Sequence, residues 1–201
     1  MDRRTTIKWM FAAAATLPLG RLVAAEPEAR PYGSDPKLLD TYHPGELWPL
    51  TLTPTQREIA TILSDTIIPA DESSPSASAV GVVDFIDEWI SAPYPAHRTD
   101  RATVFEGLAW IDAEAQRRFG KAFPALETYE IARICDDICW LPKAGPDFVE
   151  VAKFFARYRD LTAGGFYTTP AGRKDLQYVG NVPLLRFDGP PLEVLKKAGL
   201  A

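Results

Sequence analysis

The chain has 201 residues, enough for one domain that buries an ordinary hydrophobic core. Its formal net charge is −5 at pH 7, and this acidic balance argues against nucleic acid or an anionic lipid surface as the partner. Its two cysteines cannot complete a zinc site alone, and the only histidines, His43 and His97, fall in proline-flanked segments predicted to be loops far away in the sequence. No metal site is expected.

Residues 1–25 have the three parts of an export signal. The basic pair Arg3 and Arg4 precedes an apolar run over residues 9–19, which is too short to span a membrane and is interrupted by a proline. Small residues then precede a predicted cut between residues 25 and 26. The residues that define this cleavage site are Val23, Ala25 and Glu26.

The start of the chain favours the twin-arginine export route, because an alanine-rich apolar run follows the two arginines. Asp2 and Thr6 depart from the usual consensus, and an ordinary secretory signal is the alternative. Both routes lead to the periplasm. Loss of the signal would change the formal charge from −5 to −8, since it removes four basic residues and one acidic residue.

Residues 26–52 are rich in proline and predict an extended arm. The arm carries large aromatic side chains that are expected to lie on a protein surface. Its candidate contacts with a partner are Tyr32, Tyr42 and Trp48.

Residues 53–201 predict one all-α domain, an irregular bundle of about five helices with a loop-rich C-terminal tail. The first helix begins at Thr53, with proline at its first position and Gln56 completing a capping box, and it ends before Pro69. The second spans residues 80–90, with its three acidic side chains facing water. The third begins at Thr99 and stops at Gly120.

The fourth helix covers about residues 128–140 and carries both cysteines, Cys135 and Cys139, on one face. Three states are open for them: buried thiols, which are favoured, a strained disulfide within the helix, or a bond to a partner chain. The fifth helix runs from residue 146 to about residue 161, and Gly164 and Gly165 close it.

The tail, residues 166–201, is predicted to be an ordered loop with one helical turn near residues 192–197. A glycine turn there is able to present a tyrosine hydroxyl and an amide side by side, although an internally satisfied turn is the simpler interpretation. The candidate partner contacts in the tail are Tyr167, Tyr178 and Asn181.

Motifs for chemistry are missing from the sequence. No Gly-x-Ser-x-Gly elbow, phosphate-binding glycine loop or Cys-x-x-Cys-His haem motif occurs, so no catalytic or cofactor-binding residue is assigned. Asp136 and Asp137 form one of several carboxylate pairs able in principle to do acid and base work. A solvated helix face explains them better.

Several segments together resemble the gluconate 2-dehydrogenase subunit 3 family. They are the twin-arginine start, Leu52-Thr53-Pro54 with Arg57, Leu63-Ser-Asp65 followed by Ile67-Ile68-Pro69, and the tail from Phe166 to Asn181. Residues 32–36 and 44–50 are closer to the small subunits of glucoside 3-dehydrogenases within it. The resemblance implies a small subunit without a redox centre, paired with a large flavoprotein of the glucose-methanol-choline type that holds FAD. It also implies a cytochrome c, with haem c, as electron acceptor.

The sequence therefore predicts a non-catalytic subunit that serves export, folding and stability of a periplasmic sugar dehydrogenase. Two alternatives stay open. One is a solitary periplasmic binding or scaffold protein, and the other is a sugar-acting enzyme that uses carboxylates such as Asp136 and Asp137.

Overall fold

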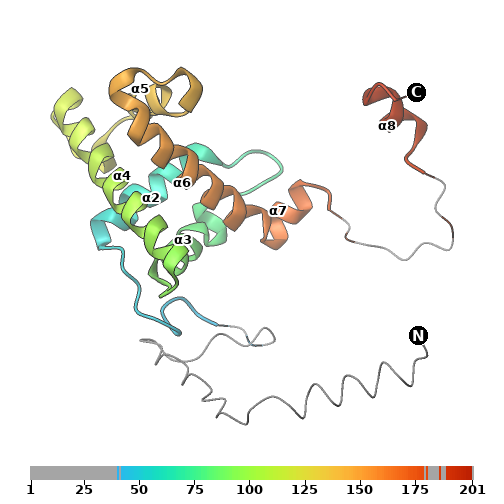
Figure 1. Cartoon of the computed structure of the whole chain (residues 1–201), viewed down its shortest axis with the longest axis horizontal. Coiled ribbons are helices and arrows are strands. Elements are labelled where there is room, and N and C mark those ends of the chain that lie inside the picture. The colour runs from blue at the N-terminus through green and yellow to red at the C-terminus, as the bar shows by residue number, and fades with distance from the viewer. Residues whose placement is uncertain (1–39, 41, 179, 181–185, 187–188, 201) are drawn as a thin grey trace, which may run out of the picture. The chain divides into compact units, whose positions relative to one another are not determined.

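A computed structural model describes residues 40, 42–178, 180, 186 and 189–200 (Figure 1). Within them the predicted all-α class is confirmed, since no strand occurs among these residues. The α-helices are α2 (Pro54–Ile67), α3 (Val82–Ser91), α4 (Pro95–Phe119), α5 (Thr128–Ile138), α6 (Val149–Tyr167), α7 (Pro170–Asp175) and α8 (Leu192–Lys197). Short 3-10 turns are η1 (Ser78–Val80), η2 (Phe123–Ala125), η3 (Leu141–Lys143) and η4 (Pro146–Phe148).

Helix α6 is the centre of the bundle and contacts α2, α3, α4, α5 and α7 (Figure 1). Its Tyr158 is fully buried, and the hydroxyl donates to the carbonyl oxygen of Ala60 at 2.9 Å and lies 3.0 Å from the hydroxyl of Ser64. Burial raises the pKa of Tyr158, so the phenol stays protonated. One satisfied polar group thereby fixes α6 against α2 within an otherwise apolar core.

Helices α2 and α4 both have proline at their first position, but only the start of α2 was predicted correctly. At α2 the capping box of Thr53 and Gln56 is present as predicted. The third predicted helix, however, begins at Pro95 rather than Thr99, so His97 lies in α4 and not in a loop. Pro95 occupies the first helical position, where its missing N–H costs nothing, and it does not act as a breaker. Gly120 ends α4 in the left-handed conformation, with φ of 67°.

The second predicted helix is divided at Gly81. This residue has φ of 83°, and it separates η1 from α3. Glycine tolerates that conformation without the clash that a Cβ would cause.

The glycine pair near residue 164 does not close the fifth helix, which was a wrong expectation. Helix α6 continues to Tyr167 with both glycines inside it. Gly165 packs against α3, where an added Cβ would lie 2.7 Å from the ring of Phe85. Close packing between helices, and not chain termination, explains this residue.

The two cysteines differ in exposure, which corrects the expectation of one shared face. Cys135 is buried, and burial raises its pKa to about 12. Cys139 is exposed at the C-cap of α5, because that helix ends at Ile138. Four residues turn a helix by about 40° beyond a full revolution, enough to move a side chain across the boundary of a buried stripe. Both thiols are free.

The beginning of the tail is helical where a loop was expected. Thr169 caps α7 by accepting a hydrogen bond from the backbone N–H of Gly172, and Pro170 takes the first position. The same Thr–Pro pair begins α2, so the sequence also contained a signal for the start of α7. The predicted turn near residues 192–197 is confirmed as α8.

Glu114 holds Arg118, the residue that links α4 to α5, and predicts acid-sensitive stability. Its carboxylate is buried and accepts from Arg117 and Arg118, and Arg118 also pairs with Asp137 of α5 at 2.7 Å. The hydrogen bond from Arg117 is the largest cause that lowers the pKa of Glu114 to about 2. The stabilisation is therefore complete above the unfolded value near 4.5 and is lost as the pH falls toward 2.

We expect Glu114→Gln to lower the free energy of unfolding by about 1 to 2 kcal/mol at pH 7, since Arg117 is largely exposed and its pairing is screened by water. The difference from wild type should shrink as the pH falls from 4.5 to about 2. Urea titrations at several pH values measure it. Glu150→Gln is the matched control, because Glu150 also pairs with a cation but is 85% exposed. A constant difference across this pH range would refute the assignment.

Candidate functional site

The end of the N-terminal arm is fastened to α3 by one buried carboxylate. Asp87 is 1% exposed, and its Oδ1 accepts from the backbone N–H groups of Thr51 and Leu52 at 3.1 Å each. The hydroxyl of Ser91 donates to the same oxygen, and Arg57 of α2 pairs with Oδ2 at 3.2 Å. The prediction that this residue faces water is wrong, because the arm covers it.

Neighbouring acidic residues of α3 add to this attachment. Glu88 accepts from the backbone N–H of Gly45, and its own carbonyl accepts from the indole N–H of Trp48 at 3.0 Å. Asp84 pairs with Arg57 and is 42% exposed. Each of the three acidic side chains of α3 that were expected to face water therefore has a partner within the protein. The arm residues 45–52 are held along α3 by hydrogen bonds to both side chains and backbone.

An apolar hollow of about 190 Å³, here called the aromatic pocket, lies where the arm meets α3 and α4. The arm contributes Trp48, whose ring meets that of Tyr94 edge-on at 6.1 Å. The ring of His97 lies 4.2 Å from that of Trp89. The lining residues are Trp48, Phe85, Glu88, Trp89, Ala92, Tyr94 and His97.

An ion pair between the buried Asp100 and the partly exposed Arg157 fixes the orientation of Trp89. Its indole N–H donates to Asp100 at 2.7 Å, and Arg157 of α6 donates twice to the same carboxylate, at 2.7 and 2.6 Å. The hydrogen bonds from Arg157 are the largest cause that lowers the pKa of Asp100. The Arg157 guanidinium also lies over the Trp89 ring, 6.0 Å from its centre. Bidentate pairing of this kind gives a fixed geometry, so the pocket is preorganised.

His97 contributes a neutral ring to the pocket. Burial is the largest cause that lowers its pKa, and the nearby charge of Asp100 opposes that effect. Its Nδ1 atom is buried and has no hydrogen-bond partner among the described residues. A proton there would have no acceptor, so the imidazole acts as a flat, uncharged surface rather than as an acid.

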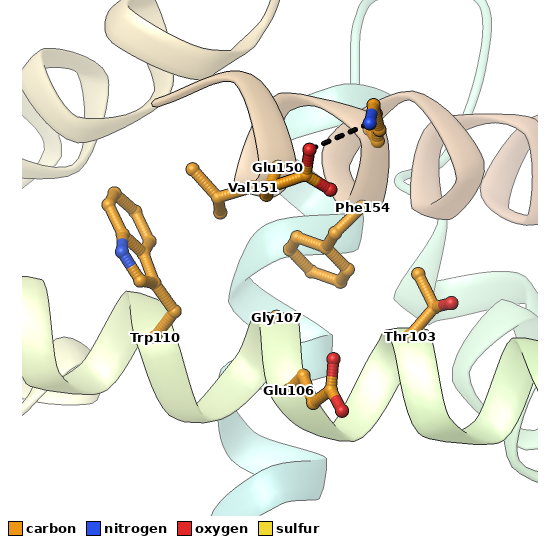
Figure 2. A pocket seen from close by; sticks show the side chains of 8 residues that line it. Thr103, Glu106, Gly107, Trp110, Glu150, Val151 and Phe154 are labelled. Atoms are coloured by element: carbon orange, nitrogen blue, oxygen red, sulfur yellow. Dashed lines mark hydrogen bonds and ion pairs between the residues drawn. The ribbon is translucent and has the colours of Figure 1, made fainter. Parts of the chain in front are cut away.

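A second hollow, here called the α4–α6 groove, has a volume of about 300 Å³ and is shown in Figure 2. Trp110 and Glu106 of α4 lie along one side, and Glu150 of α6, paired with Lys153 at 2.7 Å, lies on the other. The ring of Phe154 lies between the two helices over Gly107 (Figure 2). The remaining lining residues are Thr103 and Val151.

The close approach of α4 and α6 at this groove depends on Gly107. A Cβ built on it would lie 2.1 Å from the ring of Phe154, far inside van der Waals contact. Phe154 is 3% exposed and so fills the space that a side chain would need. The width of the groove is therefore set by backbone-to-ring packing.

The described part of the chain includes four of the predicted partner contacts, and they differ in exposure. Trp48 is half-buried in the aromatic pocket, Tyr42 is half-buried, Tyr167 packs edge-on against Phe166, and Tyr178 is 63% exposed. Of these four residues, only Trp48 lines the aromatic pocket. The predicted residues outside the described part of the chain are Arg3, Arg4, Val23, Ala25, Glu26, Tyr32 and Asn181.

The chemistry of both hollows suits binding. The part of the chain that the structure describes contains no group of three or more His, Cys, Asp or Glu side chains placed to hold a metal ion. In the same residues no helix is long and apolar enough to cross a membrane. Asp137, considered above as a catalytic carboxylate, is engaged by Arg118. Aromatic side chains at a surface are typical of sites that bind a partner protein.

Sequence reasoning missed most of the residues that build these hollows. Asp100 and Arg157 are 57 positions apart, and no local pattern connects them. Glu106 and Trp110 are four apart, a spacing that does place two side chains on one helix face, so they were accessible from the sequence.

Comparison with known proteins gives one result. No curated protein and no solved structure matches the chain. The model of one protein family, described as gluconate 2-dehydrogenase subunit 3, matches residues 54–184. This match runs from α2 to the middle of the tail and covers well over half the chain, which confirms the resemblance found in the sequence. The chain belongs to the gluconate 2-dehydrogenase subunit 3 family.

Proposed function

We propose that the chain is the non-catalytic small subunit of a periplasmic FAD-dependent sugar dehydrogenase, acting on a glucoside at carbon 3 or on gluconate at carbon 2. It serves export, folding and stability of the catalytic flavoprotein. The observation that carries the proposal is the family membership, since that family is named for one subunit of a dehydrogenase. The hypothesis that the substrate is a glucoside rests on the resemblance of arm residues 32–36 and 44–50 to the small subunits of glucoside 3-dehydrogenases.

The described surface supports a binding role. Two hollows open at the surface, and both are built from aromatic rings with carboxylates at their edges. Rigid packing and paired charges hold each one in shape, which lowers the entropic cost of receiving a partner. In this proposal the large subunit, a flavoprotein of the glucose-methanol-choline type, binds FAD and oxidises the sugar, and a cytochrome c carries the electrons onward.

The export part of the proposal rests on Arg3 and Arg4. The twin-arginine route carries folded proteins, so one signal is sufficient for a subunit and a partner without a signal of its own. The small subunit would then act as an escort to the periplasm.

Purification of the chain with a C-terminal tag, from native periplasm and membranes without denaturant, tests this function. We expect a larger yellow flavoprotein to copurify, and we expect its periplasmic amount to fall strongly when Arg3 and Arg4 are both changed to lysine. Subunit masses and an absorption spectrum are the measurements. A colourless single chain in the periplasm would contradict the proposal and favour a solitary binding or scaffold protein.

A further inference from the structure

Glu106 and Trp110 give the α4–α6 groove a particular chemistry. They are separated by one helical turn on α4, and both side chains lie at the groove (Figure 2). In Figure 2 the carboxylate of Glu106 and the indole ring of Trp110 lie on either side of Gly107 along α4. Across the groove, Val151 and Phe154 of α6 belong to the lining but are buried, at 8% and 3% exposed.

The carboxylate of Glu106 is available for a partner. It is exposed and makes no hydrogen bond or ion pair with any described residue. The other charges of the groove are already engaged, since Lys153 donates to Glu150 at 2.7 Å. The groove therefore carries one uncompensated negative charge beside an aromatic ring.

The shape of the groove is fixed on both sides. Packing of Phe154 on Gly107 sets the separation of α4 from α6. The ring of Phe148 meets that of Trp110 edge-on, at 6.0 Å and 86°, which restricts the indole. A site with fixed walls loses little conformational entropy when a side chain enters.

These features select among the possible occupants. An acidic side chain would be repelled by Glu106, and an apolar one would cover the Glu106 carboxylate without compensating its charge. A cation compensates the charge of the carboxylate. Arginine fits better than lysine, because a planar guanidinium forms two parallel bonds to a carboxylate and stacks on an indole face.

We propose that the α4–α6 groove receives an arginine side chain of the partner flavoprotein, held between the Glu106 carboxylate and the Trp110 ring. This inference rests on the proposed function for the identity of the partner. It assigns the docking surface to the outer side of α4 and α6, which the sequence had not connected to a partner.

The test compares Glu106→Gln with the matched control Glu72→Gln. Glu72 is an exposed acidic residue in the loop that follows α2, away from the groove lining, so both variants lose one surface charge. With the purified flavoprotein and tagged small subunit, we expect Glu106→Gln to raise the dissociation constant about tenfold, as loss of a charge-assisted bond does. Glu72→Gln should change it less than about twofold, within the range of a screened surface charge. Unchanged melting temperatures exclude a folding defect.

The possible results separate the two proposals. Equal affinities of the two variants for the flavoprotein would contradict the arginine site in the α4–α6 groove and leave the proposed function intact. If no flavoprotein copurifies with the wild-type chain, the proposed function fails. A titration with N-acetyl-arginine amide then tests whether the groove binds arginine. A saturable shift of the Trp110 indole N–H signal in NMR spectra, lost in Glu106→Gln, then supports an arginine site. Absence of that shift overturns it.

Discussion

Replacing Asp87 with alanine is expected to release residues 45–52 from α3 and to lower the free energy of unfolding by about 3 kcal/mol. The carboxylate is buried and accepts from two backbone N–H groups of the arm, from Ser91 and from Arg57. Its removal leaves the N–H groups of Thr51 and Leu52 without their acceptor. Arg57 keeps Asp84 as a partner, which limits the loss.

Two measurements check this expectation. Urea unfolding gives the change in stability, and limited proteolysis with chymotrypsin reports release of the arm through faster cleavage after Leu47 and Leu50, because Pro49 blocks cleavage after Trp48. Asp87→Asn should cost less, because the amide oxygen still accepts from both N–H groups. Asp84→Asn is the matched control, since Asp84 is an acidic residue of the same helix but is 42% exposed. Equal cleavage rates for wild type and Asp87→Ala would show that other contacts hold the arm.

The aromatic pocket depends on the same attachment. Trp48 reaches the pocket only while Glu88 accepts from Gly45 and supplies the carbonyl for the indole N–H. Release of the arm would remove one wall and expose the rings of Trp89 and His97, which contact each other at a tilt of 46°. Stability of the arm and shape of the pocket are therefore coupled through α3, and variants of Asp87 are expected to affect both.

Sequence signals predicted helix boundaries well where the boundary depends on interactions between neighbouring residues. The capping box at Thr53, the glycine stop at Gly120 and the apolar stripe of α2 are properties of neighbouring residues. The failures at Pro95 and Gly165 have a different cause. A proline is tolerated at a first helical position and a glycine inside a helix at a close contact, so neither residue alone marks an end.

The binding surfaces were much less predictable, because they depend on contacts between distant segments. Asp87 has the spacing of a water-facing residue, yet the arm, which lies about 35 positions earlier, covers it. The pair of Asp100 with Arg157 likewise joins α4 to α6. Hydrophobic periodicity identifies which residues are apolar, but it does not identify which polar residues receive a partner from another element.

A second large effect on stability is expected at the contact between Gly107 and Phe154. Gly107→Ala is expected to lower the free energy of unfolding by about 3 kcal/mol, because its methyl group would overlap the Phe154 ring and force α4 and α6 apart. Gly164→Ala is the matched control within the described helices. An added Cβ there meets no atom within 4 Å, so alanine should stabilise α6 by about 0.5 to 1 kcal/mol.

Urea unfolding of the two variants measures effects of opposite sign from the same substitution. The double variant Gly107→Ala with Phe154→Leu extends the test, since a smaller side chain in place of the ring relieves the overlap. Its cost should be less than the sum of the two single changes. Strict additivity would mean that the residues do not share this space. Because the same contact sets the width of the α4–α6 groove, Gly107→Ala should also weaken binding of the partner, even at temperatures where the variant is fully folded.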